Sequence, residues 1–178
     1  MKGIMFNLLE DVLVEAYGAE AWDDLLTATG ASGVYAALGD YPDADFFKLI
    51  ETSGNFTQRS RDEMLIAFGE AAFARMTERY PAILDGVADT RTFLLALNRI
   101  VQAEVRKLYA GAGCPHFRFA IAPDRLRIGY SSPRKLCALA QGLIQGVALY
   151  FDEEIEVTHS ECAHRGDAAC RMDVVWPQ

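Results

Sequence analysis

Residues 99–121 read RIVQAEVRKLYAGAGCPHFRFAI, and the spacing of the apolar side chains changes within this stretch. Before Gly111 the apolar residues follow the three-and-four spacing of an amphipathic helix, and after it they alternate as in a strand. The helical positions are Val101, Val105 and Leu108, and the alternating positions are Phe117, Phe119 and Ile121. The stretch therefore predicts an α+β protein of 178 residues, with a helical part over 1–110 and an α/β part over 111–178.

Helical patterns follow one another on the N-terminal side. The opening MKGIMFNLLEDVLVEAYG contains three carboxylates and is not followed by a small-residue cleavage site, so it predicts a packed helix rather than a signal peptide. Ser60 with Glu63 predicts a capping box, and Pro81 stops the helix that follows. The further helices are expected at 19–29, ended by Gly30; at 43–52, ended near Gly54; at 60–80; and from Thr90 onwards.

On the C-terminal side, strands surround one helix. Phe117–Ile121 and Leu126–Tyr130 alternate on either side of Pro123-Asp124, which predicts a hairpin. Pro133 is expected to open a helix that continues to Phe151. A strand around Ile155 and Val157, a loop over His159–Asp167 and a last strand over Cys170–Trp176 complete the chain.

Charge and hydropathy exclude several classes of function. Seventeen Lys and Arg against 25 Asp and Glu give a net charge of −8 without a basic run, which argues against a nucleic-acid partner. No window approaches the roughly 18 uninterrupted apolar residues of a membrane span. We therefore expect a cytoplasmic protein whose four cysteines are reduced, metal-bound or redox-active.

Tyr130, Ser132 and Arg134 form the first candidate site. Alternate residues of an extended stretch share a face, so two hydroxyls and a guanidinium would project together. This set suits a carboxylate, which arginine can bind with two hydrogen bonds. The alternative is a strand that runs into a helix, with Ser132 as the N-cap and Arg134 on the surface.

Cys137, His159, Cys162 and Cys170 form the second candidate site. Three thiols and an imidazole suit a closed, tetrahedral zinc site. The alternative is three partly buried cysteines and an unrelated surface histidine, and His164 competes with His159 for the same role.

The third candidate is Cys114-Pro115-His116, where a Cys-Pro pair could offer a thiolate to haem iron; the alternative is an ordinary loop cysteine. Motifs for phosphate binding, zinc proteolysis and serine hydrolysis are absent from the sequence. No nucleophile is paired with a base, so we expect a protein that is not an enzyme.

Taken in order, MKGIMFNLLEDVLVEAYG, AWDDLL, GVY, YPD, EVRKLY, Pro115, the Tyr130/Ser132/Arg134 triplet and SECAHRGDAAC resemble the haem-nitric oxide/oxygen binding (H-NOX) family. The resemblance spans essentially the whole chain, which implies a single H-NOX domain over 1–178. It also implies haem held between the helical and α/β parts, with the triplet on its propionates and Pro115 against the macrocycle. In some bacterial members three cysteines and a histidine bind structural zinc, which corresponds to Cys137, His159, Cys162 and Cys170.

Gln102 departs from the family pattern. Counting back from Tyr109 places the family's iron-ligating histidine at position 102, and glutamine is a weak neutral donor. Gln102, Cys114, His116 or water would then complete the coordination of the haem iron. Leu139 corresponds to the distal tyrosine of oxygen-binding members, so nitric oxide or carbon monoxide is expected to be favoured over oxygen.

Three functions follow as hypotheses. The first is a haem-binding nitric oxide sensor with an atypical iron site, which signals to a histidine kinase or a cyclic-dinucleotide enzyme. The second is a relative that binds another tetrapyrrole or senses redox through its zinc and cysteines. The third is an interaction module without a cofactor, in which residues such as Phe46, Phe68 and Met76 are ordinary core.

Overall fold

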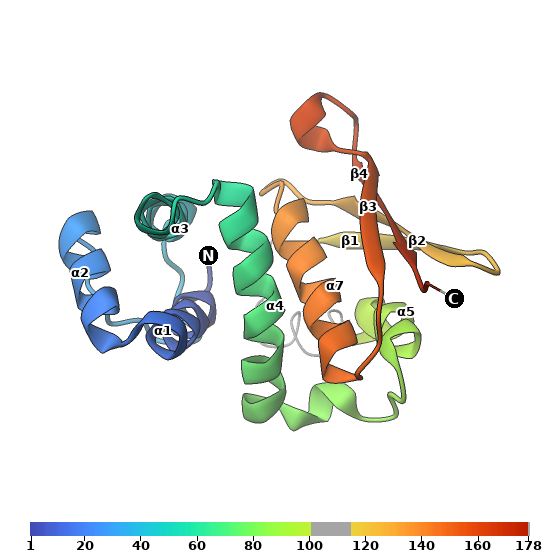
Figure 1. Ribbon diagram of the computed structural model, residues 1–178, viewed down its shortest axis with the longest axis horizontal. Coiled ribbons are helices and arrows are strands. Elements are labelled where there is room, and N and C mark those ends of the chain that lie inside the picture. The colour runs from blue at the N-terminus through green and yellow to red at the C-terminus, as the bar shows by residue number, and fades with distance from the viewer. Residues whose placement is uncertain (101–114, 178) are drawn as a thin grey trace.

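The computed structural model describes residues 1–100 and 115–177 (Figure 1). Helices come first, followed by a four-stranded sheet with one helix inserted between its hairpins, so the predicted α+β class is confirmed. The helices are α1 (Gly3–Tyr17), α2 (Ala19–Thr29), α3 (Asp43–Thr57), α4 (Arg61–Arg79), α5 (Thr90–Ile100) and α7 (Cys137–Tyr150). The strands are β1 (His116–Ile121), β2 (Arg125–Ser131), β3 (Glu156–Glu161) and β4 (Cys170–Val175).

The end of α2 and both ends of α4 lie where the sequence predicts. α2 stops at Gly30, which adopts a left-handed conformation. α4 opens with the predicted capping box: the Ser60 backbone N–H donates to Glu63 Oε2 at 2.7 Å, and the Glu63 N–H donates to Ser60 Oγ at 3.3 Å. Pro81 follows α4 and starts a short 3₁₀ helix over Pro81–Leu84.

Three local expectations were wrong. Pro133 lies in a turn, and α7 begins at Cys137, because Lys135 takes a left-handed φ of 51° that no helix accommodates. α3 runs past Gly54 and ends at Thr57. Gly54 does not end the helix; a glycine is required there because an added Cβ would lie 2.5 Å from the Arg59 carbonyl oxygen. The expected loop over 159–167 is part of β3 as far as Glu161 and then a 3₁₀ turn over Ala163–Arg165.

The strands are all antiparallel, in the order β1-β2-β4-β3. Phe119 pairs with Ile128, and Ile128 pairs with Met172, which gives the sheet one apolar face. A bulge between His159 and Glu161 interrupts the pairing of β3 with β4. The apolar face packs against α7, which in turn lies beside α4 (Figure 1).

Helices α4 and α7 are in unusually close contact. An added Cβ at Gly142 of α7 would lie 2.1 Å from the Ile66 carbonyl oxygen of α4, and one at Gly146 would lie 2.5 Å from the Glu70 carbonyl oxygen. Leu139 and Leu143 of α7 join the core formed with α1 to α4, while Ile144 joins the core beneath the sheet. α7 therefore links the two hydrophobic clusters. No helix in the described residues is both long and apolar enough to cross a membrane.

Candidate functional site

Tyr130, Ser132 and Arg134 occupy one turn at the end of β2. Tyr130 is buried, and burial raises the pKa of its hydroxyl even though hydrogen bonds with Ser132 and the Leu136 backbone lower it. The Arg134 backbone N–H donates to Ser132 Oγ at 3.3 Å. Ser132 thus contacts both other members of the predicted triplet, and it does not cap a helix.

The Arg134 side chain reaches across to α3. Its Nε donates to Asp43 Oδ2 at 2.7 Å, while Asp43 Oδ1 accepts from the α-amino group of Met1. Burial raises the pKa of Asp43, but the hydrogen bonds from Met1 and Arg134 outweigh it and hold that pKa below its ordinary value of 3.8. An ionised Asp43 therefore fixes the guanidinium that the sequence singles out.

We expect Asp43→Asn to destabilise the protein by about 1 kcal/mol at neutral pH, since it removes a charge-assisted bond in a partly exposed site. The folded-state pKa of Asp43 lies below the ordinary value of 3.8. The difference in unfolding free energy between the two proteins is therefore complete above pH 3.8, and it disappears as the pH falls through the folded-state pKa. Urea unfolding of both proteins at neutral and acidic pH measures it. Asp45→Asn, an exposed neighbour on the same helix, is the matched control. A difference that grows on acidification would contradict the assignment.

The remaining candidates for the haem site are scattered. Leu139 is buried in the cluster formed with the N-terminal helices. Pro115 is half-buried, and His116 is exposed at the start of β1. Gln102 and Cys114 lie outside the described residues.

The three cysteines of the second candidate site come together. Cys137 starts α7, Cys162 follows β3 and Cys170 starts β4, and all three are buried. Their sulfur atoms lie within 4.8 Å of one another, with 3.7 Å between Cys137 and Cys162 and 4.0 Å between Cys162 and Cys170. A tetrahedral zinc ion with Zn–S bonds of about 2.3 Å places its sulfurs roughly 3.8 Å apart. These two sulfur–sulfur distances are therefore close to those expected around a zinc ion.

Backbone N–H groups surround these sulfurs. The Ala163 N–H donates to Cys170 Sγ at 3.3 Å. Burial raises the pKa of the Cys137 thiol, and the neighbouring sulfurs raise it further. Burial also raises the pKa of Cys162, but hydrogen bonds from the His164 backbone and the Cys137 side chain outweigh it, so that pKa is lowered overall.

The two histidines of this region differ. His159 is not within 4.8 Å of every sulfur, yet its Nε2 is buried and has no hydrogen-bond partner in the described residues. His164 is exposed, and its Nε2 lies 2.7 Å from the Lys135 carbonyl oxygen. An unpartnered buried nitrogen is costly unless a ligand satisfies it, which favours His159 over His164 as the fourth ligand.

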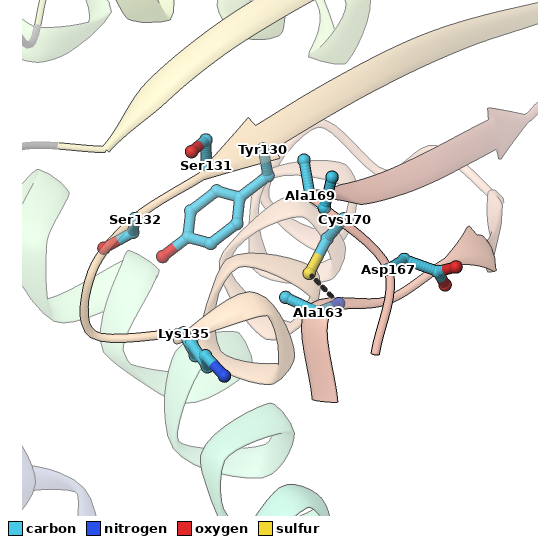
Figure 2. Close-up of a pocket in the computed structure, with 9 residues that line it drawn as sticks. Tyr130, Ser131, Ser132, Lys135, Ala163, Asp167, Ala169 and Cys170 are labelled. Carbon is cyan, nitrogen blue, oxygen red and sulfur yellow. Dashed lines mark hydrogen bonds between the residues drawn. The ribbon is translucent and has the colours of Figure 1, made fainter. Parts of the chain in front are cut away.

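A cavity of about 270 Å³ joins the two sites (Figure 2). Figure 2 shows the Tyr130 ring and Ser132 on one side of the cavity. Cys170, whose sulfur accepts a hydrogen bond from the Ala163 backbone N–H, lies on the other side. Lys135 and Asp167 also line it. Asp167 Oδ2 accepts the Cys162 N–H at 2.7 Å and so orders the turn that carries this sulfur.

Reasoning from the sequence missed Asp43, Lys135 and Asp167 as parts of these sites. Asp43 stands in the YPD motif, but nothing in its spacing connects it with Arg134, 91 residues later. Asp167 precedes Cys170 within a glycine-containing turn, and an acid at such a place is a signal for backbone capping.

The model of the haem-NO-binding family matches residues 2–159. The chain belongs to this family. The resemblance seen in the sequence is thereby confirmed, and H-NOX proteins are haem-binding gas sensors. A search of curated protein sequences found no match.

Solved H-NOX structures share the fold. An H-NOX protein from S. oneidensis in the Fe(II)NO state is 29% identical, with a TM-score of 0.92 and all of each chain covered. An Fe(II) unliganded H-NOX protein from K. algicida is 24% identical, with a TM-score of 0.85, covering 100% of this chain and 97% of that one. An oxygen-binding H-NOX domain related to soluble guanylate cyclases is 23% identical, with a TM-score of 0.83, covering 100% of this chain and 96% of that one.

Proposed function

We propose that this H-NOX chain is a haem-binding nitric oxide sensor in which Gln102 replaces the proximal histidine. The observation that carries the proposal is the turn at the end of β2, which places the hydroxyls of Tyr130 and Ser132 near each other and carries Arg134, whose guanidinium is held by Asp43. Neutral hydroxyls and a guanidinium are hydrogen-bond donors suited to a carboxylate, and haem carries two propionates. The donor set present therefore fits the porphyrin of the family.

Each residue of the turn has a distinct part in this proposal. Tyr130 stays a neutral donor because its pKa is raised. Arg134 is fixed through Nε by Asp43, and its guanidinium would bind the propionate. Ser132 would orient both neighbours through the contacts it already makes. Haem supplies the iron that binds the diatomic gas.

The gas preference follows from Leu139. This buried side chain has no hydroxyl to donate to bound oxygen, and it belongs to an apolar cluster. We therefore expect nitric oxide or carbon monoxide to bind in preference to oxygen. Gln102, Cys114, His116 or water would complete the coordination of the haem iron, and Pro115 would press on the macrocycle. Signalling to a histidine kinase or cyclic-dinucleotide enzyme in the cytoplasm is part of the same proposal.

Titration with haemin tests the haem site. The purified protein is expected to shift the Soret band and to retain haem, and Arg134→Ala should bind at least about tenfold more weakly, since a hydrogen bond to a charged group is worth about 1.5–3 kcal/mol. Arg118→Ala, an exposed arginine of β1, is the matched control and should bind like the parent. The absence of any Soret shift would sink the haem proposal and leave another tetrapyrrole or a cofactor-free interaction module.

We further propose that Cys137, Cys162, Cys170 and His159 bind structural zinc. The proposal is supported by the sulfur spacing and by the orphaned Nε2 of His159. Zinc bound there would tie α7 to β3 and β4.

Metal analysis tests the zinc site. Protein produced with zinc should contain one equivalent, and His159→Ala should bind zinc at least about tenfold more weakly. His164→Ala, which changes an exposed histidine, should keep the full equivalent. If both variants lose the same amount of bound zinc, His159 is not a zinc ligand. If the parent protein contains no zinc, the proposed zinc site is wrong.

Redox sensing is a second candidate, favoured by three sulfur atoms held within 4.8 Å. Peroxide would take two electrons from two thiolates, which form a disulfide while peroxide is reduced to water, and the zinc would be released. Mild peroxide should then release zinc and form a disulfide in the parent, whereas Cys137→Ser/Cys162→Ser, which keeps only one of the three thiols, should form none among them. If the thiolates of the parent stay reduced in peroxide, redox sensing by this site is excluded.

A further inference from the structure

The cavity of about 270 Å³ brings one sulfur of the cysteine cluster within reach of a small molecule. Cys170 lines it, whereas Cys137 and Cys162 are not among its lining residues in the described part of the chain. The Ala163 N–H donates to Cys170 Sγ at 3.3 Å and so holds the sulfur in place. Figure 2 shows this sulfur in the midst of the residues that line the cavity. A reagent that enters the cavity would therefore meet Cys170 before the other two cysteines.

Two opposite charges line the same cavity. Lys135 and Asp167 are both exposed residues of its wall. Neither forms an ion pair within residues 1–100 and 115–177. Asp167 Oδ2 accepts the Cys162 N–H at 2.7 Å, and a carboxylate can accept further hydrogen bonds. A lysine and an aspartate that do not neutralise each other suit a zwitterion, with its carboxylate at Lys135 and its ammonium group at Asp167.

The backbone at Lys135 is strained. Its φ of 51° is in the left-handed region, which a lysine rarely adopts. Its carbonyl oxygen lies 2.7 Å from His164 Nε2, so the turn before α7 is tied to the turn between β3 and β4. Residues held in sparsely populated conformations cluster at ligand sites. The strain therefore agrees with a ligand-binding part for this side chain.

The size of the cavity and the sulfur in its wall narrow the class of ligand. Drug-sized ligands occupy pockets of about 300–1,000 Å³, so this cavity suits a molecule of amino-acid size. A thiolate reacts with disulfides by attack on one of their sulfurs. A small zwitterionic disulfide combines the three properties, and cystine is the simplest one, since each of its halves carries a carboxylate, an ammonium group and a sulfur.

We propose that the cavity binds a small zwitterionic disulfide such as cystine and orients it towards Cys170. The Cys170 thiolate attacks one sulfur of cystine, whose disulfide breaks; one cysteine leaves as its thiolate, and the other stays bonded to Cys170. The Cys162 thiolate, with its sulfur 4.0 Å from Cys170 Sγ, then attacks the Cys170 sulfur, and the second cysteine leaves. Two protein thiolates are thereby oxidised to one disulfide, and cystine is reduced to two cysteines.

The inference rests on the redox candidate of the proposed function, and it names an oxidant and the residue attacked. Because the same sulfurs are the proposed zinc ligands, the disulfide between Cys162 and Cys170 would release the metal. Peroxide requires no charged recognition site, whereas cystine requires the cavity, so the two proposals can be tested apart.

Mass spectrometry after treatment with cystine tests which sulfur reacts. Cys137→Ser/Cys162→Ser keeps Cys170, and we expect one added cysteinyl group there, because no other thiol of the cluster is left to displace it. Cys162→Ser/Cys170→Ser, which keeps only Cys137 of the cluster, is the matched control and should gain none at Cys137. Peptide mapping separates these sites from Cys114. In the parent, mapping the first adduct at limiting cystine makes the same assignment without any substitution.

Three small disulfides test the recognition of both charges in the variant that keeps Cys170. Cystine carries both charges on each half, cystamine only ammonium groups and dithiodipropionate only carboxylates. With each rate divided by that of the same disulfide with a small model thiol, we expect cystine to react about tenfold faster than either. Lys135→Asn, in which asparagine tolerates the left-handed backbone, should remove the advantage over cystamine. Asp167→Asn, which keeps an acceptor for the Cys162 N–H, should remove the advantage over dithiodipropionate.

Arg118→Asn is the matched control for charge, because it removes one exposed cation on β1 and should leave these preferences unchanged. Equal normalised rates for the three disulfides would overturn the proposal, as would equal effects of Lys135→Asn and Arg118→Asn or equal modification of Cys137 and Cys170. If peroxide forms the disulfide but cystine leaves Cys170 unmodified, the cavity proposal is wrong and redox sensing is kept. If neither reagent oxidises the thiolates, both proposals are wrong.

Discussion

Gln102→His is expected to increase haem affinity at least tenfold and to give stoichiometric haem in the purified protein. The reason is chemical: imidazole is a good iron ligand, whereas a neutral amide oxygen is a weak one. The expectation rests on the sequence register and on family membership, since position 102 lies outside the described residues. Haemin titration and the absorption spectrum of the reduced protein, compared with the parent, measure the effect.

Gln58→His is the matched control, because it makes the same change at an exposed position at the end of α3. It should leave haem binding unchanged. If Gln102→His and Gln58→His bind haem equally, position 102 does not face the iron. If none of the proteins binds haem but the chain is stable, the cofactor-free hypothesis becomes the best account.

Gly142→Ala has the largest expected effect on stability. Alanine normally favours a helix over glycine by about 1 kcal/mol. Here its Cβ would lie 2.1 Å from the Ile66 carbonyl oxygen, so α4 and α7 must separate. Overpacking of this kind costs about 3 kcal/mol, which corresponds to a melting temperature lower by about 10 °C in a chain of this size.

Gly129→Ala is the control for this substitution, since its Cβ makes only ordinary contacts. Its melting temperature should stay close to that of the parent when both are followed by circular dichroism. Similar melting temperatures for Gly142→Ala and Gly129→Ala would show that the helices accommodate the methyl group and that their close approach is not required.

Local chemistry explains what could be predicted from the sequence. The capping box at Ser60 and the stop at Gly30 depend on neighbours within a few residues, and the hairpin depends on strict alternation around Pro123. The predicted start of α7 was wrong because Pro133 is compatible with either a turn or a helix start. The left-handed Lys135 decided between them, and no pattern of residue types signals that conformation at a lysine.

The sites depend on distant contacts, and here the residues alone were less informative. The sulfurs of Cys137 and Cys162 meet across 25 residues, so their spacing along the chain could not separate a metal site from buried thiols. The family resemblance favoured zinc, and the sulfur distances support it. Asp43 lay beyond prediction for the same reason, because its partner Arg134 is brought to it only by the completed fold.

The bond between Asp43 and Arg134 also constrains how this chain can evolve. Arg134 comes from the turn after β2 and Asp43 from the first turn of α3, so a loss of charge at position 43 removes the carboxylate partner of the guanidinium, whereas Asp43 without Arg134 still pairs with the α-amino group of Met1. Across homologues a change at position 43 is therefore expected to be accompanied by a change at position 134. A lineage that loses the aspartate should lose the arginine as well, and such paired substitutions would mark the members in which this turn has taken on another ligand.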